Sequence, residues 1–470
     1  MQLGTVRYVG RFLENPAFLV IAPLTVYGAP MSDSEQLAVK TSAELPEHVH
    51  TVELAVADVY GVLRGKRVPA SAWPAVLESG LHMASIIYSW TPRCEVRDVD
   101  EWLPPERGWP DMHVRPMVDT LRRVPWRPGS AMVLCDVTEE DGSELTVSPR
   151  RALHAVLEQA AAMGFVVNIG FEIEFCLLDA VTKLPRYEDV QCYGIARGAE
   201  YEPVLAPMRN QLAEFGIPIE ASNTEYGPGQ LEVNVRHGEA MATADNAVLF
   251  GNAVKEIAAQ HGYLASFMAK IRSDEPGSGL HLHHSLWGDK SNAFADHGAL
   301  SDVGRSYLGG LQRHMAEFSL LGSPTPNAFK RRQPYSFCPL SASWGVDNRT
   351  TGLRVIEGSD SSTRIEQRDG SADANPYLIM TAQIAAGLDG IENGLEPSAR
   401  QVGDDYAAPS GPLLPTTVPE AADLLEHSEL AAKVFGDKLV SVICGLARHE
   451  HALINSQVSE LERTRYLDSF

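Results

Sequence analysis

Residues 168–178 read NIGFEIEFCLL, and this stretch indicates the fold and the chemistry of the chain. Apolar side chains alternate here with Glu172 and Glu174. Because residues two apart in a strand share a face, the two carboxylates lie side by side while the apolar side chains enter the core. Taken alone, such a pair is more often a solvated strand face. Neighbouring carboxylates repel each other, however, so a bound cation is a common reason to keep two together.

A second segment, EYGPGQLEV (225–233), adds two more carboxylates. Glu225 precedes a Gly-Pro-Gly turn, and Glu232 lies in an alternating apolar run that predicts a strand. A loop followed by a surface strand explains this segment equally well when it is considered alone.

A third segment, GSGLHLHHSLW (277–287), places His281, His283 and Ser285 on one strand face and leucines on the other. The glycines of its first three residues let the backbone approach a ligand closely. A zinc site usually has three or four nitrogen or sulfur ligands. Since carboxylates outnumber histidines in these segments, we expect Mg²⁺ or Mn²⁺ instead.

A fourth segment, TRIEQR (363–368), sets Glu366 between Arg364 and Arg368 on a strand face. Arg349, Arg354 and the triplet Lys330, Arg331 and Arg332 lie a short way upstream. Arginine forks match phosphate and carboxylate oxygens bidentately. Together, the glutamates, histidines and arginines of the four strands predict a site in which divalent ions orient a nucleotide during phosphoryl transfer.

Composition restricts the classes of partner. The 39 Lys and Arg residues against 61 Asp and Glu give a net charge of −22, which argues against nucleic-acid or anionic-membrane binding. No P-loop motif and no dinucleotide-binding glycine motif leading into a helix occurs. Six cysteines without a CxxC pair favour reduced thiols and a cytoplasmic location.

Two structured regions are expected after an N-terminal extension. Residues 1–45 are interpreted as a disordered or wrongly assigned extension, with Met31 as an alternative start and an apolar stretch too short to span a membrane. Residues 46–147 are expected to form a small α+β domain, with residues 89–130 as ordered loops. Residues 148–470 predict the larger domain, which begins with a helix at Pro149 capped by Ser148.

From about Val52 to Leu467, the chain resembles the glutamine synthetase family. GFEIEF, EYGPGQLEV, GSGLHLHHSL, NRTTGLR, RIEQR and ANPYL are similar to six of the family's motifs, in the right order and spacing. The resemblance implies an α+β fold: an N-terminal β-grasp domain and a catalytic domain with a curved antiparallel sheet flanked by helices. It also implies a homo-oligomer of two stacked hexameric rings, a dodecamer with shared active sites.

The resemblance assigns roles to individual positions. Glu174, Glu225 and Glu232 would hold one metal ion, and Glu172, His281 and Glu366 a second, within a set of two or three Mg²⁺ or Mn²⁺. His283, Ser285, Arg349, Arg354 and Arg364 would bind ATP, whereas Glu174, Gly277, Arg331 and Arg368 would bind glutamate. Arg331, Arg349 and Asp58 would be catalytic; Asp58, from a neighbouring subunit, would deprotonate the attacking amine.

One segment departs from the family pattern. Where glutamine synthetases carry a flap similar to KRLVPGYEAP, this chain has KRRQPYSFCP (330–339), which puts Phe337 in the place of the flap glutamate. Ammonium binding requires carboxylates to replace its hydration shell. We therefore expect an amine pocket formed by Asp58, Phe337 and Cys338 that accepts a primary amine larger than ammonia.

The expected reaction is phosphorylation of the γ-carboxylate of glutamate by ATP, followed by attack of the amine to give a γ-glutamylamide. The less polar flap favours a monoamine such as ethanolamine, an alkylamine or an arylamine over a polyamine. The alternatives are an ordinary glutamine synthetase, a γ-glutamylpolyamine synthetase and a non-catalytic regulatory paralogue.

Overall fold

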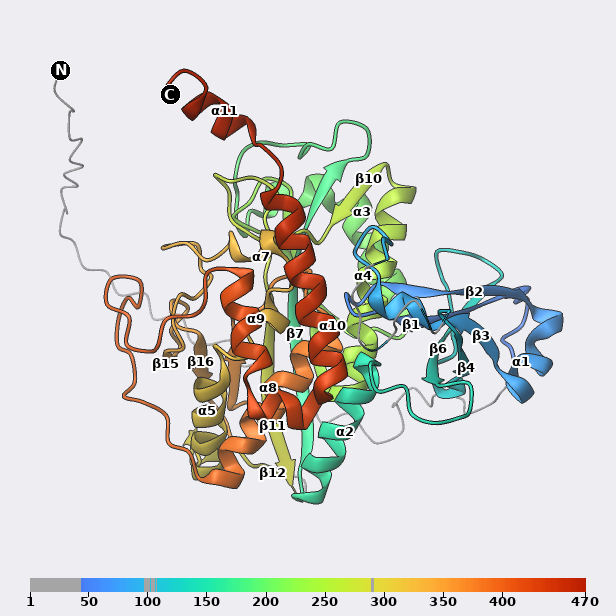
Figure 1. The fold of residues 1–470 in the computed structure, drawn as a ribbon, viewed down its shortest axis with the longest axis horizontal. Coiled ribbons are helices and arrows are strands. Elements are labelled where there is room, and N and C mark those ends of the chain that lie inside the picture. The colour runs from blue at the N-terminus through green and yellow to red at the C-terminus, as the bar shows by residue number, and fades with distance from the viewer. Residues whose placement is uncertain (1–43, 97–101, 103–105, 107, 289–290) are drawn as a thin grey trace, which may run out of the picture. The chain divides into compact units, whose positions relative to one another are not determined.

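The computed structural model describes residues 44–96, 102, 106, 108–288 and 291–470. The prediction for residues 1–45 therefore lies almost entirely outside the described residues. The described residues form one compact unit that holds two β-sheets and the helices packed on them (Figure 1).

The smaller sheet has the strand order β2-β1-β6-β4-β3, with β5 paired to β6. Its strands are β1 (Thr51–Ala57), β2 (Leu63–Pro69), β3 (Leu81–Ala84), β4 (Asp111–Pro116), β5 (Arg122–Arg123) and β6 (Ser130–Thr138). β1 runs antiparallel to β2 and parallel to β6. The short helix α1 (Trp73–Ser79) connects β2 to β3.

The expectation that residues 89–130 form loops only was wrong, because β4 and β5 lie within them. In β4, only Met112 and Val114 are apolar and buried, between charged and polar neighbours. Two apolar residues in a stretch rich in proline and arginine are too few to produce a recognisable alternation.

The larger sheet has the strand order β15-β16-β17-β11-β7-β9-β8, with β10 paired to β7 and β12 to β11. These strands are β7 (Val166–Asp179), β8 (Ile219–Thr224), β9 (Gln230–Glu239), β10 (Tyr263–Ser266), β11 (Leu280–Gly288), β12 (Ser291–Asn292), β15 (Trp344–Val346), β16 (Leu353–Ile356) and β17 (Arg364–Gln367). β13 (Ala295–Asp296) and β14 (Ala299–Leu300) form a separate hairpin. Pairing is antiparallel throughout the centre of the larger sheet, and β15 with β16 is parallel. The mixed α+β architecture is as expected.

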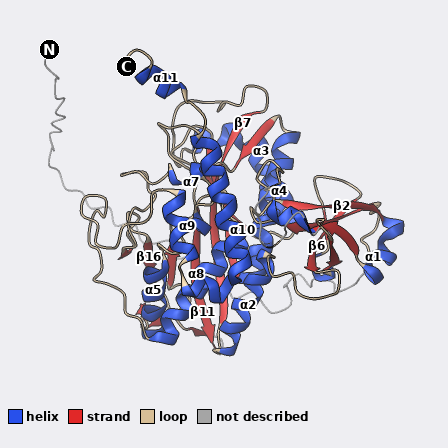
Figure 2. Ribbon diagram, viewed as in Figure 1, coloured by secondary structure: helices blue, strands red, loops and turns tan. Residues whose placement is uncertain are grey.

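Helices cover the apolar face of the larger sheet (Figure 2). The helices of this part of the chain are α2 (Pro149–Ala162), α3 (Ile195–Glu214), α4 (Ala240–Gln260), α5 (Asp302–His314), α6 (Ser319–Gly322), α7 (Pro326–Phe329), α8 (Pro376–Asn393), α9 (Val418–Glu426), α10 (Glu429–Asn455) and α11 (Glu460–Tyr466). Of these, α11 projects away from the sheet and buries none of its residues. None of the helices in the described part of the chain is both long enough and apolar enough to cross a membrane. α2 starts at Pro149 as expected, although the Ser148 side chain does not cap it.

The two faces of the larger sheet are sharply different. On the core face, the ring of Phe171 lies 6.0 Å from that of Phe250 in α4. On the same face, His284 contacts Gln383 of α8 at 2.6 Å and the hydroxyl of Tyr307 of α5 at 3.1 Å. Since side chains alternate along a strand, the histidines and glutamates on either side of these residues point to the opposite face, which the helices leave open.

We predict that His314 makes folding stability depend on pH. His314, at the end of α5, lies 2.9 Å from both Glu317 and Asp389. Burial lowers its pKa, but the hydrogen bonds and charges of the two carboxylates outweigh this and raise the pKa above the ordinary value. The stabilisation is therefore complete below about pH 6.5, the unfolded pKa, and is lost as pH rises through the folded pKa. Urea unfolding of His314→Gln should show a loss of about 1–2 kcal/mol at pH 6 and a smaller loss at pH 9.

The control for this prediction is His297→Gln, because the His297 side chain is 96% exposed. It should unfold like the parent protein at both pH values. An equal loss for His314→Gln at pH 6 and pH 9 would mean that packing, not charge, carries the effect.

Candidate active site

The strand register brings the charged side chains together on the open face of the larger sheet. Glu172 of β7 lies directly opposite His281 of β11, and Glu174 lies opposite Glu232 of β9. On the other side of β11, His283 lies opposite Glu366 of β17. The predicted placement of these side chains on strand faces is confirmed.

One cluster is formed by Glu172, Glu366 and the two histidines between them. Nδ1 of His281 lies 3.5 Å from an oxygen of each glutamate, and Nε2 of His283 lies 3.1 Å from Glu172. Burial raises the pKa of Glu172, but hydrogen bonds from both histidines lower it well below its ordinary range. One atom each of Glu172, His283 and Glu366 lie within 4.8 Å of one another, a spacing that suits a divalent ion.

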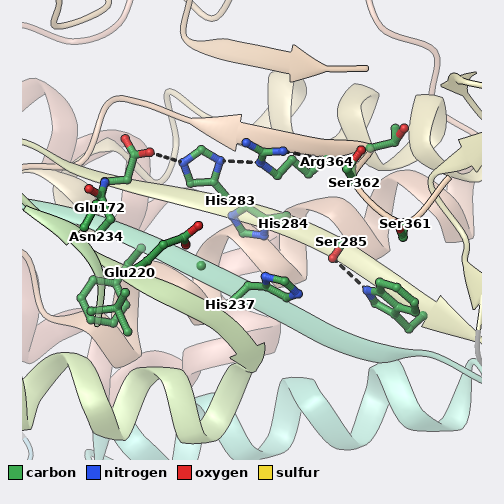
Figure 3. Close-up of a pocket in the computed structure, with 16 residues that line it drawn as sticks. Glu172, Glu220, Asn234, His237, His283, His284, Ser285, Ser361, Ser362 and Arg364 are labelled. Atoms are coloured by element: carbon green, nitrogen blue, oxygen red, sulfur yellow. Dashed lines mark hydrogen bonds and ion pairs between the residues drawn. The ribbon is translucent and has the colours of Figure 1, made fainter. Parts of the chain in front are cut away.

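Arg364 distinguishes the two histidines. Its Nε donates to Nδ1 of His283 at 3.2 Å, as Figure 3 shows. The proton of a neutral His283 ring is then on Nε2, which faces Glu172 as a donor and offers no lone pair to a metal. His281 is free of this constraint, so it fits the role of metal ligand better.

Two arginines hold Glu366 in its ionised form. Nη1 of Arg354 donates to Oε2 of Glu366 at 3.0 Å, and Arg368 pairs with Oε1. Glu366 is completely buried, and burial raises its pKa, yet Arg368 and the histidines lower it to about 2. The carboxylate is therefore charged throughout the physiological range.

The second cluster consists of Glu174, Glu225 and Glu232. Amide groups orient each one: Gln230 Nε2 lies 2.8 Å from Glu174, Asn223 Nδ2 lies 2.7 Å from Glu225, and Asn234 Nδ2 lies 3.1 Å from Glu232. Among the described residues, no lysine or arginine forms an ion pair with these three glutamates.

This second cluster suits a cation. Burial and the neighbouring charge of Glu174 raise the pKa of Glu225 to about 7. Burial and repulsion by Glu172, Glu174 and Glu225 raise the pKa of Glu232 to about 8. The three carboxylates line one cavity and are oriented by neutral amides, and they are the oxygen donors that Mg²⁺ or Mn²⁺ prefers. Unlike the ligand atoms of the first cluster, their oxygens do not all lie within 4.8 Å of one another.

A cavity of about 440 Å³ opens on one side of Glu172 (Figure 3). Three of its lining residues, His283, Ser285 and Arg364, were expected to bind ATP. Glu220, His237, Trp287, Ser361 and Ser362 also line it. The sequence did not indicate these five, because they lie on β8, β9, β11 and a loop and are joined only by the tertiary fold.

A second cavity of about 370 Å³ opens on the other side of Glu172. Its lining includes the second cluster together with Gly277, His281, Arg331, Phe337, Cys338, Arg349, Arg354 and Arg368. Arg349 and Arg354, expected to bind ATP, therefore line this cavity instead of the one with Ser285. Because Glu172 lines both cavities, a phosphoryl donor in the first would meet an acceptor in the second beside the metal ligands.

The Arg331 side chain packs against two glycines, Gly277 and Gly279. It is 4% exposed, its Nε has no hydrogen-bond partner, and a Cβ on Gly277 would lie 2.3 Å from its Cγ. A Cβ on Gly279 would also come within 3.1 Å of Arg331 Nη2. The lack of side chains at these two positions is what allows the guanidinium to enter the second cavity.

The segment 335–338 presents an aromatic ring to the second cavity. Ser336 Oγ donates to the carbonyl of Arg331 at 2.9 Å, and the hydroxyl of Tyr406 donates to that of Cys338 at 3.0 Å. Phe337, with a φ of +59°, packs on Tyr226, and their ring centroids are 5.5 Å apart. Tyr226 was not expected in the site, although its position next to Glu225 was a usable signal.

Asp58 does not line either cavity in the single chain. It is buried at the start of the β1–β2 turn, and the Asn375 side chain donates to its backbone carbonyl at 2.9 Å. The expected grouping of Asp58 with Phe337 and Cys338 is therefore absent within the described residues of one chain, as it would be if a neighbouring subunit supplied Asp58.

The family model described as glutamine synthetase, catalytic domain, matches residues 146–466. The chain belongs to the glutamine synthetase family. It is 34% identical over 444 residues to a glutamate–isopropylamine ligase of Pseudomonas, covering 90% of this chain and 95% of that one. It is 38% identical over 432 residues to a γ-glutamylethanolamide synthetase of Streptomyces coelicolor, covering 89% and 92%.

A solved structure described as a GmaS/ADP complex superimposes with a TM-score of 0.81 at 29% identity, covering 90% of this chain and 97% of that one. Members of the glutamine synthetase family are ATP-dependent ligases that form C–N bonds and use divalent metal ions, so this chain is an enzyme of that class.

We predict opposite effects of Glu232→Gln with and without metal. Without metal, the amide removes a buried charge that its neighbours repel, so unfolding should require about 1 kcal/mol more free energy at pH 8. With Mn²⁺, the variant should bind at least about ten-fold more weakly, because a ligand is lost. Thermal unfolding across a Mn²⁺ titration measures both effects.

Glu239→Gln is the matched control, since Glu239 is exposed at the end of the same strand. It should follow the parent protein with and without Mn²⁺. A Glu232→Gln variant that is less stable without metal would contradict the cation-site interpretation of the cluster.

Proposed function

We propose that this enzyme is a glutamate–amine ligase that makes γ-glutamylamides from primary amines larger than ammonia. The observation that carries the proposal is Phe337, which lines the second cavity at the position of the family's flap glutamate. Ammonium is small and strongly hydrated, and with Phe337 in this place the cavity lacks one of the carboxylates that would replace its water. An organic amine gains instead from contact with an apolar ring.

The relatives support this proposal. The Pseudomonas protein is described as a ligase of isopropylamine and the Streptomyces protein as a synthetase of γ-glutamylethanolamide. Both names specify a glutamate-derived amide of an organic monoamine, and both proteins align with this chain over nearly its whole length.

In the proposed mechanism, the second cluster, Glu174, Glu225 and Glu232, would hold one divalent ion, and Glu172, Glu366 and His281 would hold another. Bound there, such ions neutralise charge on the phosphates during transfer. His283, Ser285 and Arg364 would orient ATP in the first cavity. Arg331 and Arg368 would hold the carboxylates of glutamate in the second, with Gly277 beside them.

The remaining steps use residues that line the second cavity. Arg349 and Arg354 would stabilise the negative charge on the transferred phosphoryl group. The amine would then attack the acyl phosphate from the side of Phe337 and Cys338, and phosphate would leave. Asp58 would reach this side only from a neighbouring copy, so we propose a homo-oligomer, with the two hexameric rings of the family as the expected form.

The domain boundaries and the location are also proposals. We propose a β-grasp domain over residues 46–147 and a catalytic domain over 148–470; the two separate sheets support this division. We also propose a cytoplasmic location, supported by six cysteines that are all unpaired.

An amine panel tests the proposed function. Purified enzyme with ATP, Mg²⁺ and glutamate should release phosphate faster with ethanolamine, isopropylamine or an arylamine than with ammonia at equal concentration. Omitting glutamate is the control for uncoupled ATP hydrolysis. An ammonia rate above that of every organic amine would favour the alternative, an ordinary glutamine synthetase, and preference for a diamine or polyamine would favour a polyamine ligase.

A glycine substitution tests the glutamate site. Gly277→Ala would force the Arg331 side chain and the Ala269 carbonyl to move, because the new Cβ would lie 2.3 Å from Arg331 Cγ and 2.6 Å from Ala269 O. We expect kcat/KM for glutamate to fall by about 10–100-fold while the KM for ATP changes little. Gly198→Ala is the control, since its Cβ would meet nothing within 4 Å. Equal kinetics of the two variants would exclude Arg331 from glutamate binding.

A further inference from the structure

The cavity proposed to receive the amine leaves no carboxylate for an ammonium group. Four glutamates line it, Glu172, Glu174, Glu225 and Glu232, and the proposed function assigns each of them to a metal ion. The other charged side chains of the described lining are Arg331, Arg349, Arg354 and Arg368. A protonated amine would lose its hydration there and meet like charges.

Asp58, whichever subunit supplies it, already pairs within its own chain, so it is better suited to position a neutral amine than to bind an ammonium ion. Its Oδ1 accepts the backbone N–H groups of Tyr60 at 2.9 Å and Val62 at 3.0 Å. Its Oδ2 accepts a hydrogen bond from Nε of Arg64 at 2.8 Å, and Asp58 is 1% exposed. Arg64 itself is held over the ring of Trp90 at 5.6 Å. Pairing Asp58 with an alkylammonium ion would require breaking this buried ion pair.

The wall of the cavity is aromatic instead. Tyr226 and Phe337 pack on each other at an interplanar angle of 31°, yet their side chains remain 50% and 45% exposed. Ser336 and Tyr406 hold the backbone around Phe337, so the ring keeps its place. Exposed aromatic faces of this kind bind another ring by offset stacking or by edge contact.

We propose that the acceptor is a weakly basic aromatic amine, neutral near pH 7, whose ring packs on the Tyr226–Phe337 pair. This inference rests on the proposed function and narrows its substrate class. The lone pair of an arylamine is delocalised into the ring, so the amine reaches the site without a proton that a carboxylate would have to remove. Its nitrogen forms the bond to the γ-carbonyl carbon, the bond to the phosphate oxygen breaks, and one amine proton ends on the released phosphate.

Aniline and cyclohexylamine form a matched pair for the test, because the rings have equal numbers of atoms but only cyclohexylamine is aliphatic and cationic. With the full-length enzyme, ATP, Mg²⁺ and glutamate at pH 7.5, kcat/KM should be at least about ten-fold higher for aniline. Phosphate release and mass-spectrometric detection of γ-glutamylanilide give the readout.

The outcomes separate the two proposals. Cyclohexylamine used as well as or better than aniline overturns the inference and leaves the proposed glutamate–amine ligase standing. Ammonia preferred over both amines, or no turnover with any amine, overturns both proposals.

Variants assign the preference to the aromatic pair. Tyr226→Leu and Phe337→Leu should each lower the ratio of kcat/KM for aniline to that for cyclohexylamine, and Phe337→Glu should lower it furthest by restoring an anion. Tyr466→Leu is the control, since Tyr466 is an exposed aromatic residue of α11 and lies outside the cavity lining. An unchanged ratio in all three variants would show that the pair does not select the ring.

Discussion

The site depends on the repulsion among glutamates that the strand register and the turn after β8 place in the lining of the second cavity. Glu174 faces Glu232 across one strand pair, and Glu172 faces His281 across the next. Folding buries these charges, and burial with mutual repulsion raises the pKa of Glu225 and Glu232. Such an arrangement is stable only when something positive compensates it, and the two clusters differ in what does so.

In the first cluster the chain supplies its own compensation. Arg354 and Arg368 pair with Glu366, and two histidines contact Glu172. In the second cluster, neutral amides orient the carboxylates without neutralising them. Among the described residues, the second cluster therefore lacks the positive partners that the first cluster finds within the chain.

The opposite face of the same sheet explains why this arrangement can be held rigidly. Phe171 packs against α4, and His284 is hydrogen-bonded to α5 and α8. Each strand thus places every second side chain in a close-packed core. This packing fixes the backbone, and with it the positions of the site residues between them. The segment 335–338, by contrast, is a loop outside the sheet, and Phe337 lines the second cavity without belonging to its strands. Phe337 of the proposed acceptor pocket and the proposed metal sites therefore rest on different elements.

The sequence by itself determined the strand faces, because a period of two fixes which side chains lie together whatever the partner strand. The paired glutamates of β7, the histidine face of β11 and the arginine-flanked Glu366 all follow from this rule, and the order of the motifs indicated the family. A short strand such as β4 was missed because two buried residues do not establish a period.

Only the tertiary structure decided which faces meet. Glu172 lines both cavities, and Arg349 and Arg354 line the second. Tyr226 packs on Phe337 although the two residues lie in loops distant in sequence. Strand register and loop packing are set by the sum of many core contacts across the whole sheet, and no local pattern encodes that sum.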